Sequence, residues 1–381
     1  MVNDSPAVWV TGMAWSTGLG ADLKTVWEAL LAGASAIDHV PTEHDLRSDL
    51  AVALPHLPLD MPLAERQHAL TCSTLETALN DAGIAADAPQ LTSVLGTSYA
   101  HHLDDTATES LSDWASAAAR TLGFKRPPIV VSTACSAGAD AIQVGLTLIR
   151  DGGADLCVCG GADILSEGKR LGHSRLGTLS PDGLYAFDRS HSGTVLGEGA
   201  AFIVLESKAH AQARGAQPYG FIVGAGAAND AVNAVAPDPS GQNVINTVER
   251  ALLSAGLHHD DIALINAHGT GTQINDNVES IAYSSLFANN AHPPVLFATK
   301  GALGHTLGAT GAIEAIVVLL ALNHHCAPPV YALQQPLDAL KLPIPIHTPM
   351  VVGKGYGISV TLGFGGFDTC LVLQGAQRSL S

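Results

Sequence analysis

A cysteine stands where an apolar run gives way to a string of small residues. Cys135 follows "VVSTA" and precedes "SAGAD", and the apolar spacing beyond it predicts a helix over 136–150 that ends at Gly152-Gly153. The N–H groups and the dipole at a helix N-terminus favour a thiolate, so we expect a lowered pKa for this thiol. The position also suits a small buried hydrophobe. Position alone therefore leaves a nucleophile and a packing residue equally open.

Two further segments place polar side chains in apolar surroundings. In "INAHGTGT", His268 ends an apolar run and precedes a Gly/Thr turn, where α/β proteins often hold reactive groups. A surface-loop histidine is the alternative, since the chain has 17 histidines. In "TKGALGHTLGATGAIEA", Lys300, His305 and Glu314 each need a partner, because burying an unpaired polar group is costly. A phosphate loop is the rival interpretation of this segment, but the chain has no G-x-x-x-x-G-K-[ST] string.

A glycine loop and several histidine pairs complete the candidates. Phe364 lies in the loop 363–366 between two strand-like arms, and the motif alone does not decide between a functional and a core role. Adjacent histidines in polar contexts lack the i, i+4 spacing and the nearby cysteines of metal sites; they stand at 101/102, 258/259 and 324/325. We expect these pairs to be solvated, and we expect no bound metal.

The elements that must position these residues occur twice along the chain. "VWVTGMAWSTGLG" is matched by "YGFIVGAGAANDA", "TSVLGTSYA" by "IALINAHGTGT", and "AAFIVLES" by "TCLVLQG". Between them, the cysteine segment and the lysine–histidine segment each read as a strand, a small-residue turn and a helix. The pattern predicts an α/β fold with helices against a buried sheet. The polar stretch "KAHAQARGAQP" marks the expected boundary between 1–215, with the cysteine, and 216–381, with both candidate histidines.

The composition narrows the class of protein. The 381 residues are 47% hydrophobic and 14% charged, with a net charge of −17, which argues against binding to nucleic acid or to a membrane surface. The six cysteines show no disulfide-scaffold density, no signal peptide is visible, and the longest apolar run, "AIVVLLAL", is too short to span a bilayer. We therefore expect a soluble cytoplasmic enzyme.

Taken together, these motifs resemble the β-ketoacyl-acyl-carrier-protein synthases, the elongating condensing enzymes of the thiolase superfamily. "TACSAGA", "FDRSHSGTVLGEGAA", "NAHGTGT", "KGALGHTLGATGAIE" and "GFGG" occur in the order of that family, and the match covers most of the chain. The resemblance implies a thiolase-like fold of two βαβαβαββ halves in five layers, α-β-α-β-α. It also implies a dimer, either a homodimer or a heterodimer with a related ketosynthase or chain-length factor.

The resemblance assigns roles to the polar residues. Cys135 is the nucleophile that accepts an acyl chain from a phosphopantetheine thioester. His268 and His305 donate hydrogen bonds to the malonyl thioester carbonyl and stabilise the enolate that forms as carbon dioxide leaves. Lys300 and Glu314 form the pair that supports them.

The resemblance also assigns the substrate contacts. The backbone amides of Cys135 and Phe364 form an oxyanion hole, and Phe364 gates access to it. Thr270 and Thr272 match positions that contact pantetheine. The substrates are carried by the phosphopantetheine of an acyl carrier protein, so no separate cofactor is implied.

Several positions depart from the family pattern. The segment between "GTSYA" and "VVSTACS" is shorter than in typical members, and it usually helps to build the acyl pocket and the dimer interface. Asp368 stands where Asn is usual, Phe367 where a smaller polar residue is usual, and Ser192 where an acidic residue is usual. These departures are similar to those of secondary-metabolite or polyene-type type II synthases.

The expected reaction is a decarboxylative Claisen condensation between an acyl chain on Cys135 and malonyl carrier protein, in fatty-acid or type II polyketide elongation. One alternative is a non-catalytic chain-length-factor-like partner, although such partners commonly lack the cysteine. Another is a thiolase-like enzyme acting on coenzyme A thioesters, which the two-histidine pattern disfavours.

The acidic carrier protein needs local basic residues on this acidic chain. The candidate clusters are Lys125-Arg126, or Lys169-Arg170 with Arg175. A solvated surface without a docking role is the alternative for each of these clusters.

Overall fold

The computed structural model describes residues 7–104, 110–376 and 378. Its centre is a mixed sheet in which one half of the chain supplies five neighbouring strands, in the order β5-β4-β6-β7-β1. β4 runs parallel to β5 and β6, whereas β7 is antiparallel to β6 and β1. These strands are β1 (Val8–Ser16), β4 (Thr92–Gly96), β5 (Ile129–Val131), β6 (Leu156–Asp163) and β7 (Gly199–Glu206).

The second half repeats the arrangement. Its strands follow the order β10-β9-β13-β14-β8, with β9 parallel to β10 and β13, and with β14 antiparallel to β13 and β8. They are β8 (Gly220–Asn229), β9 (Ile262–Asn266), β10 (Val295–Phe297), β13 (Tyr356–Gly363) and β14 (Phe367–Gly375). The strand order and directions match those of the first half, so the duplication expected from the sequence is confirmed. A short antiparallel pairing of β1 with β8 joins the halves.

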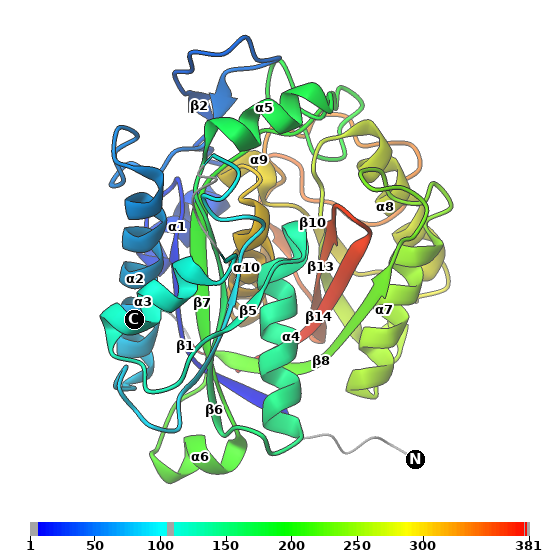
Figure 1. Cartoon of the computed structure of the whole chain (residues 1–381). Coiled ribbons are helices and arrows are strands. Elements are labelled where there is room, and N and C mark those ends of the chain that lie inside the picture. Colours follow the sequence, from blue (N-terminus) through cyan, green and yellow to red (C-terminus); the bar gives the residue numbers. More distant parts are fainter. Residues whose placement is uncertain (1–6, 105–109, 377, 379–381) are drawn as a thin grey trace.

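The helices make five layers with the two half-sheets (Figure 1). One outer layer packs on the first half-sheet and consists of α2 (Leu63–Ala82) and α3 (Asp113–Leu122). The central layer consists of α4 (Ala137–Arg150) and α10 (Thr310–His324), which pack on each other and on strands of both halves. The other outer layer covers the second half-sheet and consists of α7 (Gln242–Ala255) and α8 (Gln273–Leu286). The predicted α-β-α-β-α layering is therefore confirmed.

Shorter elements lie around this frame. The remaining helices are α1 (Leu23–Leu31), α5 (Glu167–Arg175), α6 (Lys208–Ala213) and α9 (Lys300–Leu303). Two small antiparallel ribbons pair β2 (Asp38–His39) with β3 (Leu50–Ala51), and β11 (Cys326–Ala327) with β12 (Met350–Val351).

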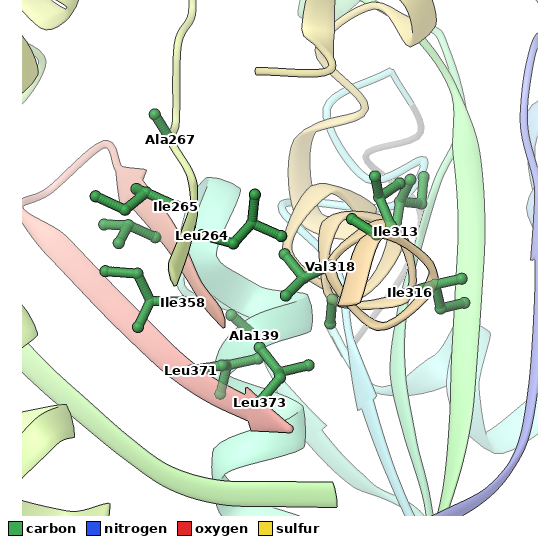
Figure 2. Packing of buried hydrophobic residues seen from close by; sticks show 14 of the residues in the cluster. Ala139, Leu264, Ile265, Ala267, Ile313, Ile316, Val318, Ile358, Leu371 and Leu373 are labelled. Atoms are coloured by element: carbon green, nitrogen blue, oxygen red, sulfur yellow. The ribbon is translucent and has the colours of Figure 1, made fainter. Parts of the chain in front are cut away.

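Helix α10 is apolar on all sides because it is surrounded by protein. Ile313, Ile316 and Val318 face different neighbours in Figure 2, among them strand residues of the second half-sheet such as Leu264. A helix that is hydrophobic all round belongs in a core or in a membrane. The stretch Leu307–His324 is long and apolar enough to cross a bilayer, but 89% of it is buried inside the protein. Its apolar character is accounted for by the core.

The turns before α4 and α10 share one backbone shape. Each starts with a non-glycine residue in the left-handed region, Ala134 at φ 51° and Leu307 at φ 52°. Each then makes a 3₁₀ turn, Ala134–Ser136 or Leu307–Ala309, that leads directly into the helix. The helix predicted from residue 136 therefore begins at Ala137, and Cys135 lies in the 3₁₀ turn.

Candidate active site

Hydrogen bonds hold the turn around Cys135. The Asp140 carboxylate, one turn into α4, accepts from the hydroxyl of Ser136 at 2.9 Å and from that of Thr133. The Ser136 hydroxyl also reaches the Thr133 carbonyl at 2.9 Å. These contacts support the left-handed Ala134, a conformation that costs energy in a residue with a side chain. The sulfur is thus presented by a fixed turn rather than by a mobile loop.

The structure brings the cysteine and both predicted histidines together at one cavity. Cys135 Sγ lies 3.1 Å from Nε2 of His305, and the rings of His305 and His268 have centroids 5.3 Å apart at 87°. All three line a cavity of about 440 Å³. Nδ1 of His305 lies 3.2 Å from the hydroxyl of Thr310, which fixes the ring. Residues from distant parts of the chain therefore meet because the two repeated turns abut in the central layer.

The expected lowered pKa of the Cys135 thiol is wrong for the free protein. Burial raises this pKa to about 12, although Lys300 and the backbone N–H groups of Phe364 and Cys135 act to lower it. Burial, with Lys300 close by, also holds the pKa values of His268 and His305 well below 6.5. The N-terminus of a helix cannot offset the loss of water around the sulfur. The resting pair is a neutral thiol and a neutral imidazole.

Lys300 and Glu314 form the expected pair. Lys300 Nζ donates to Glu314 Oε1 at 2.7 Å, and both side chains are 1% exposed. The same ammonium donates to the backbone carbonyl of His268. Thr299 Oγ1 donates to Glu314 at 3.2 Å. Burial raises the pKa of Glu314, and the adjacent ammonium opposes this shift. The ion pair therefore ties the turn that carries His268 to helix α10.

Sequence reasoning missed a second support for His268. The Glu279 carboxylate on α8 accepts from the backbone N–H groups of His268 and Gly269, each at 2.7 Å. Asn275 and Tyr283 also donate to it, at 2.8 and 2.9 Å. Burial raises the pKa of Glu279 to about 7. The sequence shows Glu279 only as an acidic residue in the helix that follows "NAHGTGT". This position does not distinguish Glu279 from a carboxylate on the surface.

The remaining predicted contacts also line the cavity. Thr270 and Thr272 do so with their hydroxyl oxygens 2.9 Å apart. Phe364 lines the cavity as well, and its ring stacks on His173, with centroids 5.4 Å apart and an interplanar angle of 21°. Asp368, one of the residues that differ from the family pattern, lines the same cavity. His173 is a cavity residue that the sequence motifs did not indicate.

Two expectations about surface residues are wrong. Lys169 and Arg170 are 3% and 2% exposed: Lys169 pairs with Asp163 at 2.7 Å, and Arg170 donates to backbone carbonyls including that of Val40. They brace the fold and cannot dock a partner. The residues at 101 and 102 are also buried, at 5% and 8%, rather than solvated. Within residues 7–104, 110–376 and 378, no group of three His, Cys, Asp or Glu could hold a metal ion.

Comparisons with known proteins identify the family of this chain. Residues 58–211 match the N-terminal domain of β-ketoacyl synthases, and residues 219–334 match the C-terminal domain. The chain is 32% identical to 3-oxoacyl-[acyl-carrier-protein] synthase 2 of Mycobacterium tuberculosis, over 96% of each protein. The chain belongs to the β-ketoacyl synthase family. Members of this family are acyltransferases that form carbon–carbon bonds on carrier-bound chains and need no separate cofactor.

Other relatives extend over nearly the whole chain. Nodulation protein E of Rhizobium leguminosarum bv. trifolii is 30% identical over 96% of this chain and 98% of its own length. A β-ketoacyl synthase structure from Burkholderia phymatum superposes with a TM-score of 0.87 at 27% identity, covering 97% of this chain and 100% of that one. The ishigamide ketosynthase/chain length factor gives the same TM-score and identity, covering 97% and 99%.

Proposed function

We propose that this β-ketoacyl synthase condenses an acyl chain held on Cys135 with malonyl carrier protein, in fatty-acid or type II polyketide elongation. The observation that carries the proposal is the contact of 3.1 Å between Cys135 Sγ and His305 Nε2, beside the His268 ring, in an accessible cavity. A purely packing cysteine has no need of two histidines at a cavity wall. The proposed site residues are those whose spacing indicated chemistry in the sequence.

The first step is a thioester exchange. The Cys135 thiol is neutral at rest, so its proton moves to Nε2 of His305 as the sulfur attacks the acyl carbonyl. The new S–C bond forms, the bond to the carrier thiol breaks, and the carrier thiolate takes the proton from His305. The backbone N–H groups of Cys135 and Phe364 interact with the sulfur and lower the pKa of the thiol. They therefore lie close to the position where the negative charge of the oxyanion develops.

The second step is the condensation. His268 and His305, both neutral, donate N–H hydrogen bonds to the malonyl thioester carbonyl; His305 does so as its Nε2–H tautomer, with Nδ1 accepting from the Thr310 hydroxyl. The bond to the carboxylate then breaks with release of carbon dioxide. The enolate carbon attacks the acyl carbonyl on Cys135, and collapse of the adduct expels the Cys135 thiolate, which takes a proton from solvent. Lys300 contributes positive charge beside the enolate while its pairing with Glu314 keeps it in place.

Substrate delivery follows from the cavity mouth. Thr270 and Thr272 contact the pantetheine arm, and their hydroxyl groups match its amides in chemistry. Arg47 and Leu176 lie at the mouth, both exposed to solvent. Arg175, which directly precedes Leu176, is exposed as well. This group suits the acidic surface of a carrier protein better than the Lys125-Arg126 cluster, which is exposed but does not line the cavity.

The proposed assembly is a cytoplasmic dimer with a second copy or with a related ketosynthase or chain-length factor. Strand β5 supports this assembly because it is the last strand at one end of the sheet, and Ile129 on it is 40% exposed. Such an unpaired edge is a template for another chain. Light scattering of the purified protein, alone and with a candidate partner, distinguishes the homodimer from the heterodimer.

The test of the function is intact-mass spectrometry with acyl- and malonyl-carrier protein. We expect the wild type to gain one acyl mass on Cys135 and to release the condensed β-ketoacyl carrier. Cys135→Ala should show neither acylation nor condensation. Cys72→Ala, at a half-buried cysteine outside the cavity, is the matched control and should behave as wild type.

Two results would change the assignment. Condensation by the Cys135→Ala variant would contradict the mechanism. A folded wild type that is never acylated would instead favour the non-catalytic partner of another ketosynthase, and acylation from coenzyme A alone would favour a thiolase-like enzyme.

A further inference from the structure

His173 is a third histidine at the cavity, and the proposed reaction does not use it. It lies on α5, lines the cavity with Cys135 and stacks on Phe364. A positive charge on His173 would lower the pKa of His305, so the two rings lie near one another. His173 therefore stands beside the route by which an acyl chain reaches the sulfur.

The tautomer of His173 is set by Thr178. Nδ1 of the ring lies 2.9 Å from the Thr178 hydroxyl, and that hydroxyl donates its own hydrogen to the His173 carbonyl at 3.2 Å. The hydroxyl has one hydrogen, so it accepts from Nδ1–H. Burial and Lys169 lower the pKa of His173 to about 4, so the ring is neutral. Nε2 consequently carries a lone pair and no proton.

Nε2 of His173 has no hydrogen-bond partner among the residues that the structure describes. His173 is half-buried and lines the cavity, and Nε2 is not fully buried, so this nitrogen is open to a ligand. Stacking on Phe364 fixes the ring plane. The cavity that contains the reacting sulfur therefore also contains an oriented hydrogen-bond acceptor.

We propose that His173 is a specificity-determining residue whose Nε2 accepts a hydrogen bond from a hydroxyl group on the acyl chain, so that the enzyme favours hydroxylated over unsubstituted chains. The inference rests on the proposed condensation at Cys135 and names the substrate class for that site. A keto oxygen cannot serve, because it has no hydrogen to donate. An amide of the pantetheine arm is common to all substrates and would give no preference between chains.

The test measures acylation of Cys135 by competing pantetheine thioesters of hexanoic, 3-hydroxyhexanoic and 5-hydroxyhexanoic acid. Wild type should take up one of the hydroxylated chains about tenfold faster than hexanoate, a ratio that corresponds to one hydrogen bond. His173→Phe keeps a ring on Phe364 and removes the acceptor, so the ratio should fall to about one. Thr178→Val removes the hydroxyl that fixes the tautomer and should lower the ratio at least about threefold.

His324→Phe is the matched control, because His324 stacks on Trp27 with similar geometry, 5.6 Å and 25°, away from the cavity. Its ratio should equal that of wild type. Equal rates for all three thioesters in wild type, or an unchanged ratio in His173→Phe, would overturn the inference and leave the proposed function intact. If His173→Phe does not fold, an unchanged ratio in Thr178→Val overturns it. Absence of any acylation in wild type would overturn both proposals.

Discussion

At the scale of single residues, Asp368 is the least expected side chain at the site. Its carboxylate is 2% exposed and accepts from Asn243 Nδ2 at 2.5 Å. Burial, together with the neighbouring carboxylates of Asp230, Glu279 and Asp140, raises its pKa to about 7, against the hydrogen bond from Asn243. At a position where the resemblance to the family implies an amide, this chain thus has an acid.

This acid makes stability depend on pH. The carboxyl group titrates near 3.8 in the unfolded chain and near 7 in the folded protein, so between these values only the folded protein keeps the proton. The free energy of unfolding contributed by Asp368 therefore falls as the pH rises from about 4 to 7. The free energy of unfolding of Asp368→Asn, relative to that of wild type, should therefore increase by roughly 2 kcal/mol from pH 5 to pH 8. Urea denaturation at both pH values measures this gain.

Asp87→Asn is the control for that measurement, because Asp87 is exposed and its replacement should change stability by less than about 0.5 kcal/mol. A gain for Asp368→Asn that is the same at pH 5 and pH 8 would show that the carboxyl group does not titrate in this window.

Sequence reasoning found the residues whose types are rare in apolar surroundings, such as Cys135, Lys300 and His305. It missed Glu279 and His173, because a carboxylate or a histidine on an amphipathic helix looks like a surface residue until its neighbours are known. It also misjudged charge. The Lys169 ammonium donates to Asp163, at the end of β6, and to the Ile164 carbonyl, only six and five residues before it. The sequence does not show that the chain folds back there, so the buried ion pair was not predicted.

At the scale of elements, close packing in the central layer depends on glycine residues that have no side chain. Gly308, in the 3₁₀ turn before α10, packs against the backbone that follows β4: a Cβ there would lie 2.3 Å from Ser98 N and 2.5 Å from an Asp163 oxygen. Its N–H donates to Asp163 at 2.8 Å, and Ser98 N–H donates to the same carboxylate at 2.6 Å. Asp163 therefore joins the two halves beside the site.

Gly308→Ala should destabilise the protein by roughly 2–3 kcal/mol, because the backbone of Thr97 and Ser98 cannot move away from a methyl group. Gly172→Ala is the control: Gly172 lies within α5, a Cβ there meets nothing within 4 Å, and alanine is the better helix former by about 0.5–1 kcal/mol. Thermal and urea unfolding of both variants measure the difference. Equal stability of Gly308→Ala and wild type would mean that the turn is not closely packed.

The elements themselves were largely predictable. The repeated strings in the two halves correspond to β1 and β8, β4 and β9, and β7 and β14, because buried strands and small-residue turns leave strong local patterns. Which strands neighbour one another, and that the two central helices meet between the half-sheets, depends on contacts between distant segments. The division of the chain at residue 215 stays a prediction.

At the scale of the whole molecule, the net charge of −17 opposes an acidic partner. Some of the positively charged side chains are buried and cannot attract a partner. These are Arg66, Lys169, Arg170 and Lys300. The exposed Arg175 beside the cavity mouth is therefore a large share of the local attraction available to a carrier protein.

Arg175→Glu should raise KM for carrier-bound substrate about fivefold to tenfold at low ionic strength, and the effect should shrink as salt screens the charges. Free pantetheine thioesters should react at the wild-type rate. Lys354→Glu is the matched control: Lys354 is exposed and precedes β13, whereas Phe364 follows the other end of that strand. An unchanged KM for Arg175→Glu would show that the carrier protein binds at a surface that does not include Arg175.

The duplicated turn also limits how much substrate one chain can load. Cys135 and Gly308 occupy equivalent places, each directly after a left-handed residue and inside a 3₁₀ turn. The close backbone at Gly308 leaves no room for a second cysteine side chain there. We therefore expect one acyl group per chain, on Cys135: the second half has a turn of the same shape, but closely packed backbone occupies the place of the nucleophile.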